Sequence, residues 1–141
     1  MTMEGSCLCG NVKFSLDVTP DAANLTSVCH CRPCRKISGS TTSLNLTVPT
    51  KAFTLTSGNL KTIKTKHMDE GFEFSLSFCP ACGSPIYAVP HFMPELDIVV
   101  VQAGTLDEVA PLLKTPATEL NVAHRLPWQT QIGGAAQKEK Y

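Results

Sequence analysis

Apolar and polar side chains alternate with a period of two along several stretches of the chain. The alternation is clear in residues 12–18, 44–48 and 53–55, and it is strongest in residues 72–78. Successive side chains of a strand point to opposite faces of a sheet, so each stretch predicts a strand with one buried face. Glycine and proline residues lie between the stretches, as expected where strands end in turns.

Two later stretches add to this pattern. Residues 97–103 are continuously apolar at their centre, which is typical of a strand covered on both faces, and residues 119–124 predict a last short strand. No window carries a sustained helical stripe, so we expect only one helical turn at residues 105–108 and another after Cys34. The chain is therefore expected to be mainly β.

Length and charge favour one domain without a highly charged partner. The 141 residues suit a single hydrophobic core, and 12 basic against 12 acidic residues give a net charge of 0, which does not favour nucleic acid or an anionic membrane. The basic cluster of Lys61, Lys64 and Lys66 lacks interleaved aromatic residues and predicts a solvated edge strand. We expect one domain over residues 1–128 and a loose polar C-terminal tail over residues 129–141.

The first residues carry no targeting signal. They lack a basic region followed by an apolar stretch, and the longest aliphatic run, residues 98–101, is far too short to span a membrane. We therefore expect a cytoplasmic protein in a reducing compartment, where structural disulfides are rare.

The seven cysteines fall into three tight groups. These groups are Cys7 and Cys9, then Cys29, Cys31 and Cys34, then Cys79 and Cys82. An odd number leaves one thiol over from a full set of disulfides, and a reducing compartment disfavours disulfides in any case. Spacings of one or two residues let two thiolates reach one ion, so the pattern predicts metal ligation.

The outer two groups predict a closed structural zinc site. Its four thiolate ligands would be Cys7, Cys9, Cys79 and Cys82. Gly10 and Gly83 each follow the second cysteine of a pair and permit the tight turn that aims backbone N–H groups at the sulfurs. Such a site would join the start of the first strand to the end of the strand at residues 72–78.

The middle group supplies three cysteines where a closed site needs four. Three protein ligands and one open position are the arrangement of a catalytic zinc, so Cys29, Cys31 and Cys34 are the candidate catalytic ligands. Other interpretations remain open: an iron–sulfur cluster, an empty site, or closure of the site by a histidine. The candidate histidines are His30, His67, His91 and His124.

Longer motifs surround the three cysteine groups: Gly-Ser-Cys-Leu-Cys-Gly-Asn-Val at residues 5–12, Cys-His-Cys-Arg-Pro-Cys-Arg-Lys at 29–36 and Phe-Cys-Pro-Ala-Cys-Gly-Ser-Pro at 78–85. With these motifs the sequence resembles the glutathione-dependent formaldehyde-activating enzyme (GFA) family, also called the CENP-V/GFA domain. Residues 38–40 and 103–107 and the late Trp128 also match family landmarks. The three cysteine groups in series are far more specific than any one of them.

The resemblance implies a fold, a cofactor and a reaction. The fold is a single β-tent-type domain, with a structural Zn²⁺ on the outer groups and a second, more weakly held Zn²⁺ on the middle group, where a thiol substrate docks. Two zinc ions per chain are therefore expected. The named reaction is the reversible addition of glutathione to formaldehyde, a carbon–sulfur lyase chemistry. Its partners are a small thiol and an aldehyde.

Several polar residues near the middle group are candidates for roles in this reaction. Arg35 and Lys36 follow the third cysteine and are candidate anion contacts, while His30, Ser38 and Ser40 are candidate hydrogen-bond donors. Arg125, beside His124, is a candidate contact for a substrate carboxylate. A plain surface role for Arg35 and a local ion pair for Arg125 are the structural alternatives.

Two other functions compete with thiol addition. Water or a substrate carbonyl at the fourth zinc position would give hydrolysis, isomerisation or decarboxylation of another small metabolite. A non-catalytic zinc module that binds partner proteins would instead fill both zinc sites with protein atoms.

Overall fold

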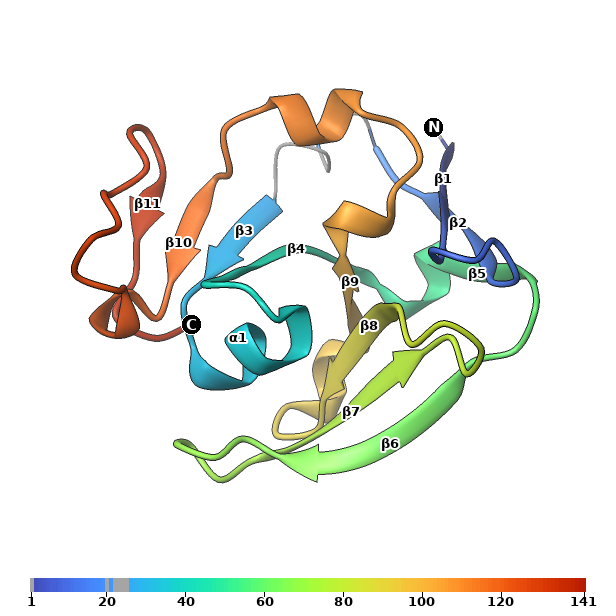
Figure 1. Cartoon of the computed structure of the whole chain (residues 1–141), viewed down its shortest axis with the longest axis horizontal. Coiled ribbons are helices and arrows are strands. Elements are labelled where there is room, and N and C mark those ends of the chain that lie inside the picture. The colour runs from blue at the N-terminus through green and yellow to red at the C-terminus, as the bar shows by residue number, and fades with distance from the viewer. Residues whose placement is uncertain (1, 20, 22–25) are drawn as a thin grey trace.

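The computed structural model describes residues 2–19, 21 and 26–141, and in them the chain forms two β-sheets. The smaller sheet is antiparallel and has the strand order β1-β2-β5. Its strands are β1 (Thr2–Ser6), β2 (Lys13–Asp17) and β5 (Phe53–Ser57). This small sheet lies on the right of the view in Figure 1, near the N-terminal end of the chain.

The larger sheet has eight strands in the order β11-β10-β3-β4-β9-β8-β7-β6. They are β3 (Thr26–Cys29), β4 (Ser43–Pro49), β6 (Lys61–Lys66), β7 (Glu73–Phe78), β8 (Pro85–Pro90), β9 (Ile98–Gln102), β10 (Thr118–Leu120) and β11 (Ala136–Gln137). Neighbours are antiparallel except for β10 with β3 and β11 with β10, which are parallel. The lysine-rich strand β6 is an edge strand, as its sequence predicted.

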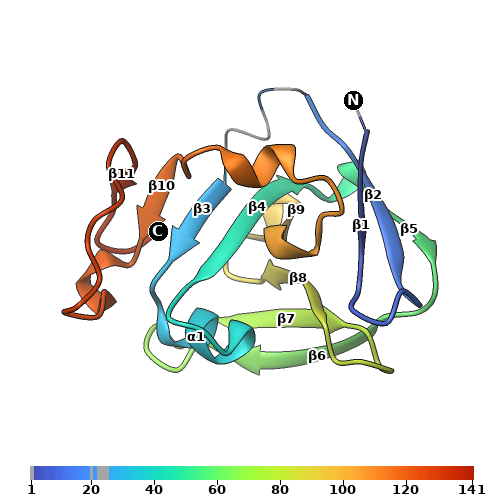
Figure 2. The same cartoon turned by 45° about the horizontal axis from the view of Figure 1, so that its top comes forward.

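The helical elements of the described residues are short. The α-helix α1 (Arg32–Ser38) lies between β3 on one side and the β6–β7 pair on the other (Figure 1 and Figure 2). The 3₁₀ helices are η2 (Thr50–Ala52), η3 (Pro94–Leu96), η4 (Ala103–Thr105), η5 (Ala110–Leu113) and η6 (Val122–His124). None of the helices in the described part of the chain is long and apolar enough to cross a membrane.

The hydrophobic core is built by strands of both sheets. Phe14 of β2 is fully buried, and its ring stacks on Phe53 with 5.1 Å between centroids. Phe53 in turn meets Tyr87 of β8 edge-on at 4.9 Å, so an aromatic series connects the two sheets. Buried apolar side chains of β4, β8 and β9, among them Leu46, complete the core.

The observed strands lie close to the stretches predicted from alternation and from the apolar run at residues 97–103. Strands β2, β4, β5, β7 and β9 occupy the predicted stretches within a residue or two at each end. The helix expected after Cys34 begins earlier, at Arg32, because the Cys31 side chain caps it. The turn expected at residues 105–108 lies instead at Ala103–Thr105.

The last predicted strand, at residues 119–124, is only partly correct. Strand β10 ends at Leu120, and residues Val122–His124 form the 3₁₀ helix η6. The cause is Asn121, whose φ of 55° lies in the left-handed region and breaks the extended conformation.

Of the apolar side chains of β7, only Phe74 is buried, whereas the alternation suggested a fully buried face. Ser77 is buried, whereas Leu76 and Phe78 are half-buried and line a groove together with Ile37 of α1. The groove has a volume of about 440 Å³ and lies between α1 and the β6–β7–β8 strands. Leu76 and Phe78 of β7 therefore line a surface groove rather than the protein interior.

The segment expected to be a loose tail is attached to the domain. Strand β11 pairs in parallel with β10, and the Ile132 N–H donates to the Glu119 carboxylate at 2.8 Å. The Lys138 and Lys140 main chains also bond to residues 119–122. The domain boundary at residue 128 stays a prediction, but residues 129–141 are bound rather than loose.

Candidate metal centres

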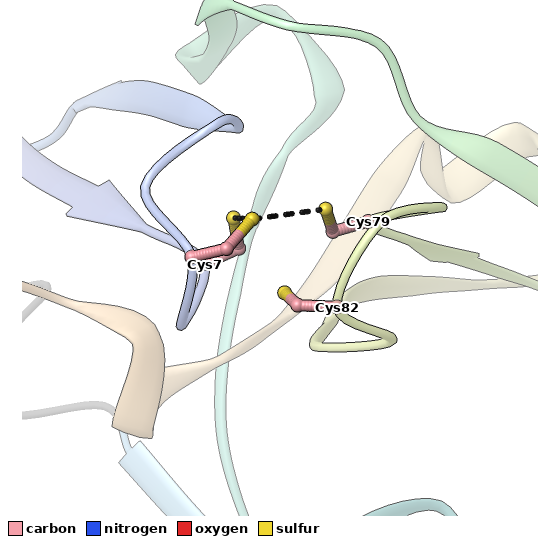
Figure 3. Close-up of side chains that lie close together, drawn as sticks. Cys7, Cys79 and Cys82 are labelled. Carbon is pink, nitrogen blue, oxygen red and sulfur yellow. Dashed lines mark hydrogen bonds between the residues drawn. The ribbon is translucent and has the colours of Figure 1, made fainter.

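Four cysteines from two loops converge between the sheets. Cys7 and Cys9 follow β1, and Cys79 and Cys82 follow β7. All four sulfurs lie within 4.8 Å of one another, with 3.5 Å between the Cys7 and Cys9 sulfurs and 3.8 Å between those of Cys9 and Cys79. Figure 3 shows the sulfurs of the two loops facing a common space. This four-cysteine centre can hold one metal ion with sulfur alone.

Each loop of the four-cysteine centre turns at a glycine, as predicted. Gly10 and Gly83 have φ values of 80° and 79°, which favour a residue without a Cβ atom. The Gly10 N–H donates to the Cys7 carbonyl at 3.0 Å, and the Gly83 N–H donates to the Cys79 carbonyl at 2.8 Å. The first turn is closed by a hydrogen bond between residues three apart and the second by one between residues four apart, and each brings two sulfurs to the same side.

Hydrogen bonds favour thiolate at two of these four cysteines. Burial opposes ionisation of Cys7, but the Val12 N–H donates to its sulfur at 3.2 Å and helps to lower its pKa. The Ser84 hydroxyl and N–H lower the pKa of Cys82 to about 5. Although the Asn11 N–H favours the Cys9 thiolate, neighbouring thiols raise the pKa of Cys9 to about 11. A cation is therefore needed before all four sulfurs become thiolates.

The middle group forms a second, three-cysteine centre at the N-terminal end of α1. Cys29 ends β3, Cys31 caps α1 and Cys34 lies in its first turn. Their sulfurs lie within 4.8 Å of one another. Cys29 and Cys31 are each 1% exposed, and only Cys34 is partly accessible. A ligand that reaches this centre must therefore approach from the side of Cys34.

Without a cation, only one of the three sulfurs, that of Cys31, is favoured as a thiolate. Hydrogen bonds from Cys29 and Cys34 lower the pKa of Cys31. The same contacts act oppositely on the partners: Cys31 helps to raise the pKa of Cys29 to about 11, and Cys29 and Cys31 raise that of Cys34 well above its ordinary value. The donor set is all sulfur, which suits zinc, and a divalent ion would stabilise three thiolates together.

No histidine completes the three-cysteine centre. The ligand atoms that lie within 4.8 Å of one another belong to the three cysteines, and all four histidines are in the described part of the chain. His30 instead places its Nε2 2.8 Å from the Glu119 carboxylate, and His91 places its Nε2 2.6 Å from the Ser75 hydroxyl. The structure therefore places no histidine as a fourth ligand of the three-cysteine centre, which was one of the alternatives from sequence.

Glu119 joins the loop of the three-cysteine centre to the end of the chain. This carboxylate is 1% exposed, and it accepts hydrogen bonds from the Ile132 N–H at 2.8 Å and the Gln137 amide at 2.7 Å. It also pairs with His30 at 2.8 Å and Arg125 at 3.2 Å. Burial alone would raise its pKa, but the partners, led by His30, lower it to about 2. Glu119 therefore remains ionised and fixes His30 between Cys29 and Cys31.

Three of the predicted substrate contacts lie around one cavity. Arg35, Lys36 and Ser40 line a hollow of about 460 Å³ beside α1, together with Arg32. Ser38, by contrast, donates to the Thr42 carbonyl at 2.9 Å and so closes the end of the helix. Their roles in binding substrate stay predictions.

Arg125 does not line this hollow, although its neighbour Leu126 does. Its guanidinium pairs with the Glu119 carboxylate and bonds to the Gln137 amide oxygen, which corresponds to the local ion pair considered from sequence. A role in binding a substrate carboxylate stays a prediction.

Sequence reasoning missed three residues near the three-cysteine centre. They are Glu119, which pairs with His30, Asn121, which donates to the Cys29 sulfur, and Tyr141, which contacts His67. His67 was considered only as a metal ligand. The only sequence signal was a lone carboxylate beside an apolar residue in a short strand, Glu119-Leu120. The other contacts join segments far apart in the chain, which no local pattern reports.

Fold and site together define a mainly β protein with two cysteine clusters, each able to hold a metal ion. The family model described as "Glutathione-dependent formaldehyde-activating enzyme" matches residues 2–123. The chain belongs to this GFA family. The family assignment made from the three cysteine motifs is thereby confirmed.

A solved structure supports the same fold. The crystal structure of a Rhodobacter sphaeroides protein is similar to this chain with a TM-score of 0.59 and 19% sequence identity. The match covers 81% of this chain and 98% of the other. The search of curated proteins found no match.

Proposed function

We propose that this protein is a zinc-dependent enzyme of the carbon–sulfur lyase type that adds a small thiol reversibly to an aldehyde. The observation that carries the proposal is the contrast between the two centres: four cysteines complete one, and only three cysteines supply the other. A complete set of four thiolates is typical of a structural zinc, and three protein ligands leave a position for a substrate.

The cysteines would divide into two ligand sets, with zinc as the metal of both. The structural zinc would be held by Cys7, Cys9, Cys79 and Cys82, and the catalytic zinc by Cys29, Cys31 and Cys34. When bound at the three-cysteine centre, zinc lowers the pKa of a coordinated thiol, which makes a thiolate available near neutral pH.

The surrounding residues would bind and orient the substrates. Arg35 and Lys36, on the hollow beside α1, are placed to attract an anionic group of the thiol, and Ser40 on the same hollow can donate a hydrogen bond. His30 is buried against Glu119, so it would act as a positioning residue for Cys29 and Cys31. Glutathione, the thiol in the family's description, carries such anionic groups.

The proposal includes a cytoplasmic location. Low-molecular-weight thiols are kept reduced there, and seven free cysteines are compatible with that compartment. Neither nucleic acid nor a membrane is a partner in this proposal, since the net charge is 0 and the substrates are small molecules.

Cobalt substitution tests the proposed function. Cobalt replaces zinc in sulfur sites and makes the coordination sphere visible by its absorption. We expect titration with glutathione to change the spectrum of the wild-type protein, and subsequent formaldehyde to change it again as the thiol is consumed.

The matched control is Cys31→Ser, which removes one ligand of the three-cysteine centre and leaves the four-cysteine centre intact. Its spectrum should show the four-sulfur site alone and should not respond to thiol. A wild-type spectrum that no thiol alters would favour the non-catalytic zinc module instead.

A further inference from the structure

The groove between α1 and the β6–β7–β8 strands has a volume of about 440 Å³ and a mostly apolar lining. Its apolar side chains include Ile37 of α1, Ile63 of β6, and Leu76 and Phe78 of β7. Lys36 and Lys66 line it as well, and no acidic side chain of the described residues does. Small-molecule sites commonly have such linings and volumes of about 300 to 1,000 Å³. The groove therefore suits a small apolar ligand.

Strand register gathers these apolar side chains on one face. Ile63 lies opposite Leu76 and Thr65 opposite Phe74 in the antiparallel β6–β7 pair, and directly opposite side chains share a face of the sheet. This face is turned toward α1, since residues of both strands and of the helix line the groove. Ile63 is 41% exposed, so the chain itself does not cover this surface. An open, concave apolar surface of this kind is typical of a binding site.

One end of the groove lies beside the three-cysteine centre. Pro33, which lines the groove, directly precedes Cys34, the partly accessible ligand. Ile37 follows Cys34 by three residues, and side chains at this spacing are neighbours on a helix, with about 5 to 6 Å between their Cβ atoms. Arg32 pairs with Asp69, with 3.0 Å between Nε and Oδ1, and so binds this end of α1 to the turn between β6 and β7. The groove therefore begins next to Cys34.

The cationic hollow beside α1 adjoins the groove at Lys36, which lines both. Arg32 and Arg35 also line the hollow. The Nε atom of Arg35 is buried and has no hydrogen-bond partner among the described residues, so an anionic ligand group would satisfy it. One cavity thus suits an anionic group and the other suits an apolar group, and both lie along the helix that carries Cys34.

We propose that the groove binds the apolar body of the substrate aldehyde, so that the substrate is a hydrophobic aldehyde with an alkyl or aromatic group rather than formaldehyde. This inference rests on the proposed function, in which the hollow receives the anionic thiol. The alkyl or aromatic group packs against Ile63 and Leu76, and the carbonyl lies at the end of the groove beside Cys34. Formaldehyde has no such group and gains nothing from the groove, whereas burial of apolar surface stabilises the complex with a larger aldehyde.

A second copy of the chain fits this groove less well. Strand β6 is an edge strand, and Lys61, Lys64 and Lys66 are spaced along it. Two such edges side by side would bring like charges together, and lysines on an edge strand are a common means of preventing that pairing. The lysines therefore favour a small molecule as the occupant.

The test compares octanal with acetaldehyde as substrates of the zinc-loaded protein, with glutathione as the thiol. The two carbonyl groups have similar reactivity, so a difference reports the alkyl chain. We expect kcat/KM for octanal, after subtraction of the uncatalysed rate, to be about tenfold or more above that for acetaldehyde. Ile63→Glu puts a charge into the groove, and the ratio of the two values should then fall by about tenfold or more. Octanol, which cannot react, should bind the wild-type protein in calorimetry and bind this variant about tenfold more weakly.

The matched control is Leu55→Glu, which puts the same charge on strand β5 of the small sheet. Leu55 is 39% exposed, close to the 41% of Ile63, and does not line the groove. This variant should keep the wild-type ratio and the wild-type affinity for octanol. If Ile63→Glu does not fold, Ile63→Thr keeps a β-branched side chain, removes apolar area and is measured in the same way.

Three results would overturn the inference. They are equal kcat/KM values for octanal and acetaldehyde in the wild type, octanol binding that Ile63→Glu leaves unchanged, and a wild-type dimer in sedimentation that Ile63→Glu dissociates. In the last case a second copy of the chain fills the groove.

The two proposals also fail separately. Thiol addition to acetaldehyde without octanol binding overturns this inference and leaves the proposed function standing. Octanol binding that depends on Ile63, without thiol addition to any aldehyde, overturns the proposed function and the aldehyde as the occupant. Only the groove as a site for apolar ligands then remains.

Discussion

Glu119 shows how a single buried charge is made stable in this protein. A carboxylate that is 1% exposed would be costly in isolation, yet four groups bind it: a histidine, an arginine, an amide and a backbone N–H. Its partners are His30 in the loop of the three-cysteine centre, Arg125 directly after η6, and Ile132 and Gln137 near the end of the chain. Removing the charge should therefore loosen all three segments together.

Replacement of Glu119 with Gln should change how stability depends on pH. The folded-state pKa of about 2 lies below the ordinary 4.5, so the carboxylate stabilises the fold above pH 4.5, and this contribution is lost as the pH falls toward 2. The difference corresponds to about 3 kcal/mol. Urea unfolding should show Glu119→Gln well below the wild type at pH 6, with the gap narrowing by pH 3.

Zinc bound by thiolates would leave both proteins in acid, so the informative quantity is the difference in unfolding free energy between them. Glu95→Gln, at an exposed carboxylate, is the control and should match the wild type at both pH values. An equal gap between wild type and Glu119→Gln at pH 6 and pH 3 would show that the carboxylate charge is not what stabilises the network.

Gly5 is fixed by the side chain opposite to it. In the β1–β2 pairing Gly5 faces Phe14, and a Cβ atom at Gly5 would lie 2.1 Å from the Phe14 ring. Phe14 is fully buried and cannot move aside without disturbing Phe53. We expect Gly5→Ala to lower the free energy of unfolding by about 1 to 3 kcal/mol, the usual cost of overpacking.

Denaturant titration measures this effect, with Gly104→Ala as the control. No atom lies within 4 Å of a Cβ built at Gly104, so that variant should unfold near the wild-type midpoint. Equal midpoints for the two variants would mean that the Phe14 ring finds other space.

Between elements, the two cysteine centres join very different lengths of chain. The four-cysteine centre connects the loop after β1, in the small sheet, to the loop after β7, in the large sheet, across 70 residues of sequence. The three-cysteine centre spans only residues 29–34. Closing a long loop removes more chain entropy than closing a short one, so the first centre should matter more for folding.

Single ligand substitutions should separate these two contributions. A structural zinc supplies roughly 10 to 16 kcal/mol of apparent binding free energy, more than a typical domain's whole stability. Cys79→Ser should therefore give insoluble or unfolded protein, whereas Cys31→Ser should be soluble, melt cooperatively and contain one zinc fewer. Calorimetry and elemental analysis check both. A Cys31→Ser protein that unfolds as completely as Cys79→Ser would make the middle centre a second structural site.

Elements with a regular local signal could be predicted from sequence, and contacts between distant segments could not. Period-two alternation predicted β2 and β4, a continuous apolar run predicted β9, and cysteine spacing predicted the division into four and three ligands. His67 and Tyr141, 74 residues apart, and His30 and Glu119, 89 apart, meet only because the sheet brings them together. The same holds for the apolar stripe of β7, whose groove exists only once α1 packs nearby.

Over the whole molecule, four distant segments meet at the three-cysteine centre. They are the end of β3, helix α1, the turn between β6 and β7, and residues 136–141. Arg32 of α1 pairs with Asp69 of that turn, with 3.0 Å between Nε and Oδ1. Such a junction is held by side-chain contacts as well as by its metal ligands, so it should keep its shape when the ion leaves.

This arrangement predicts stepwise loss of two metals. We expect about two zinc ions per chain after purification without chelator, because the cysteines supply four ligands at one centre and three at the other. During titration with a chelator, native mass spectrometry should show one zinc leaving first, while circular dichroism stays native. The three-cysteine centre should be the first to empty, since fewer protein ligands hold its ion. The second zinc should leave only together with unfolding, because the four-cysteine centre joins the two sheets. Simultaneous loss of both ions with the fold would show that the centres act as one structural unit.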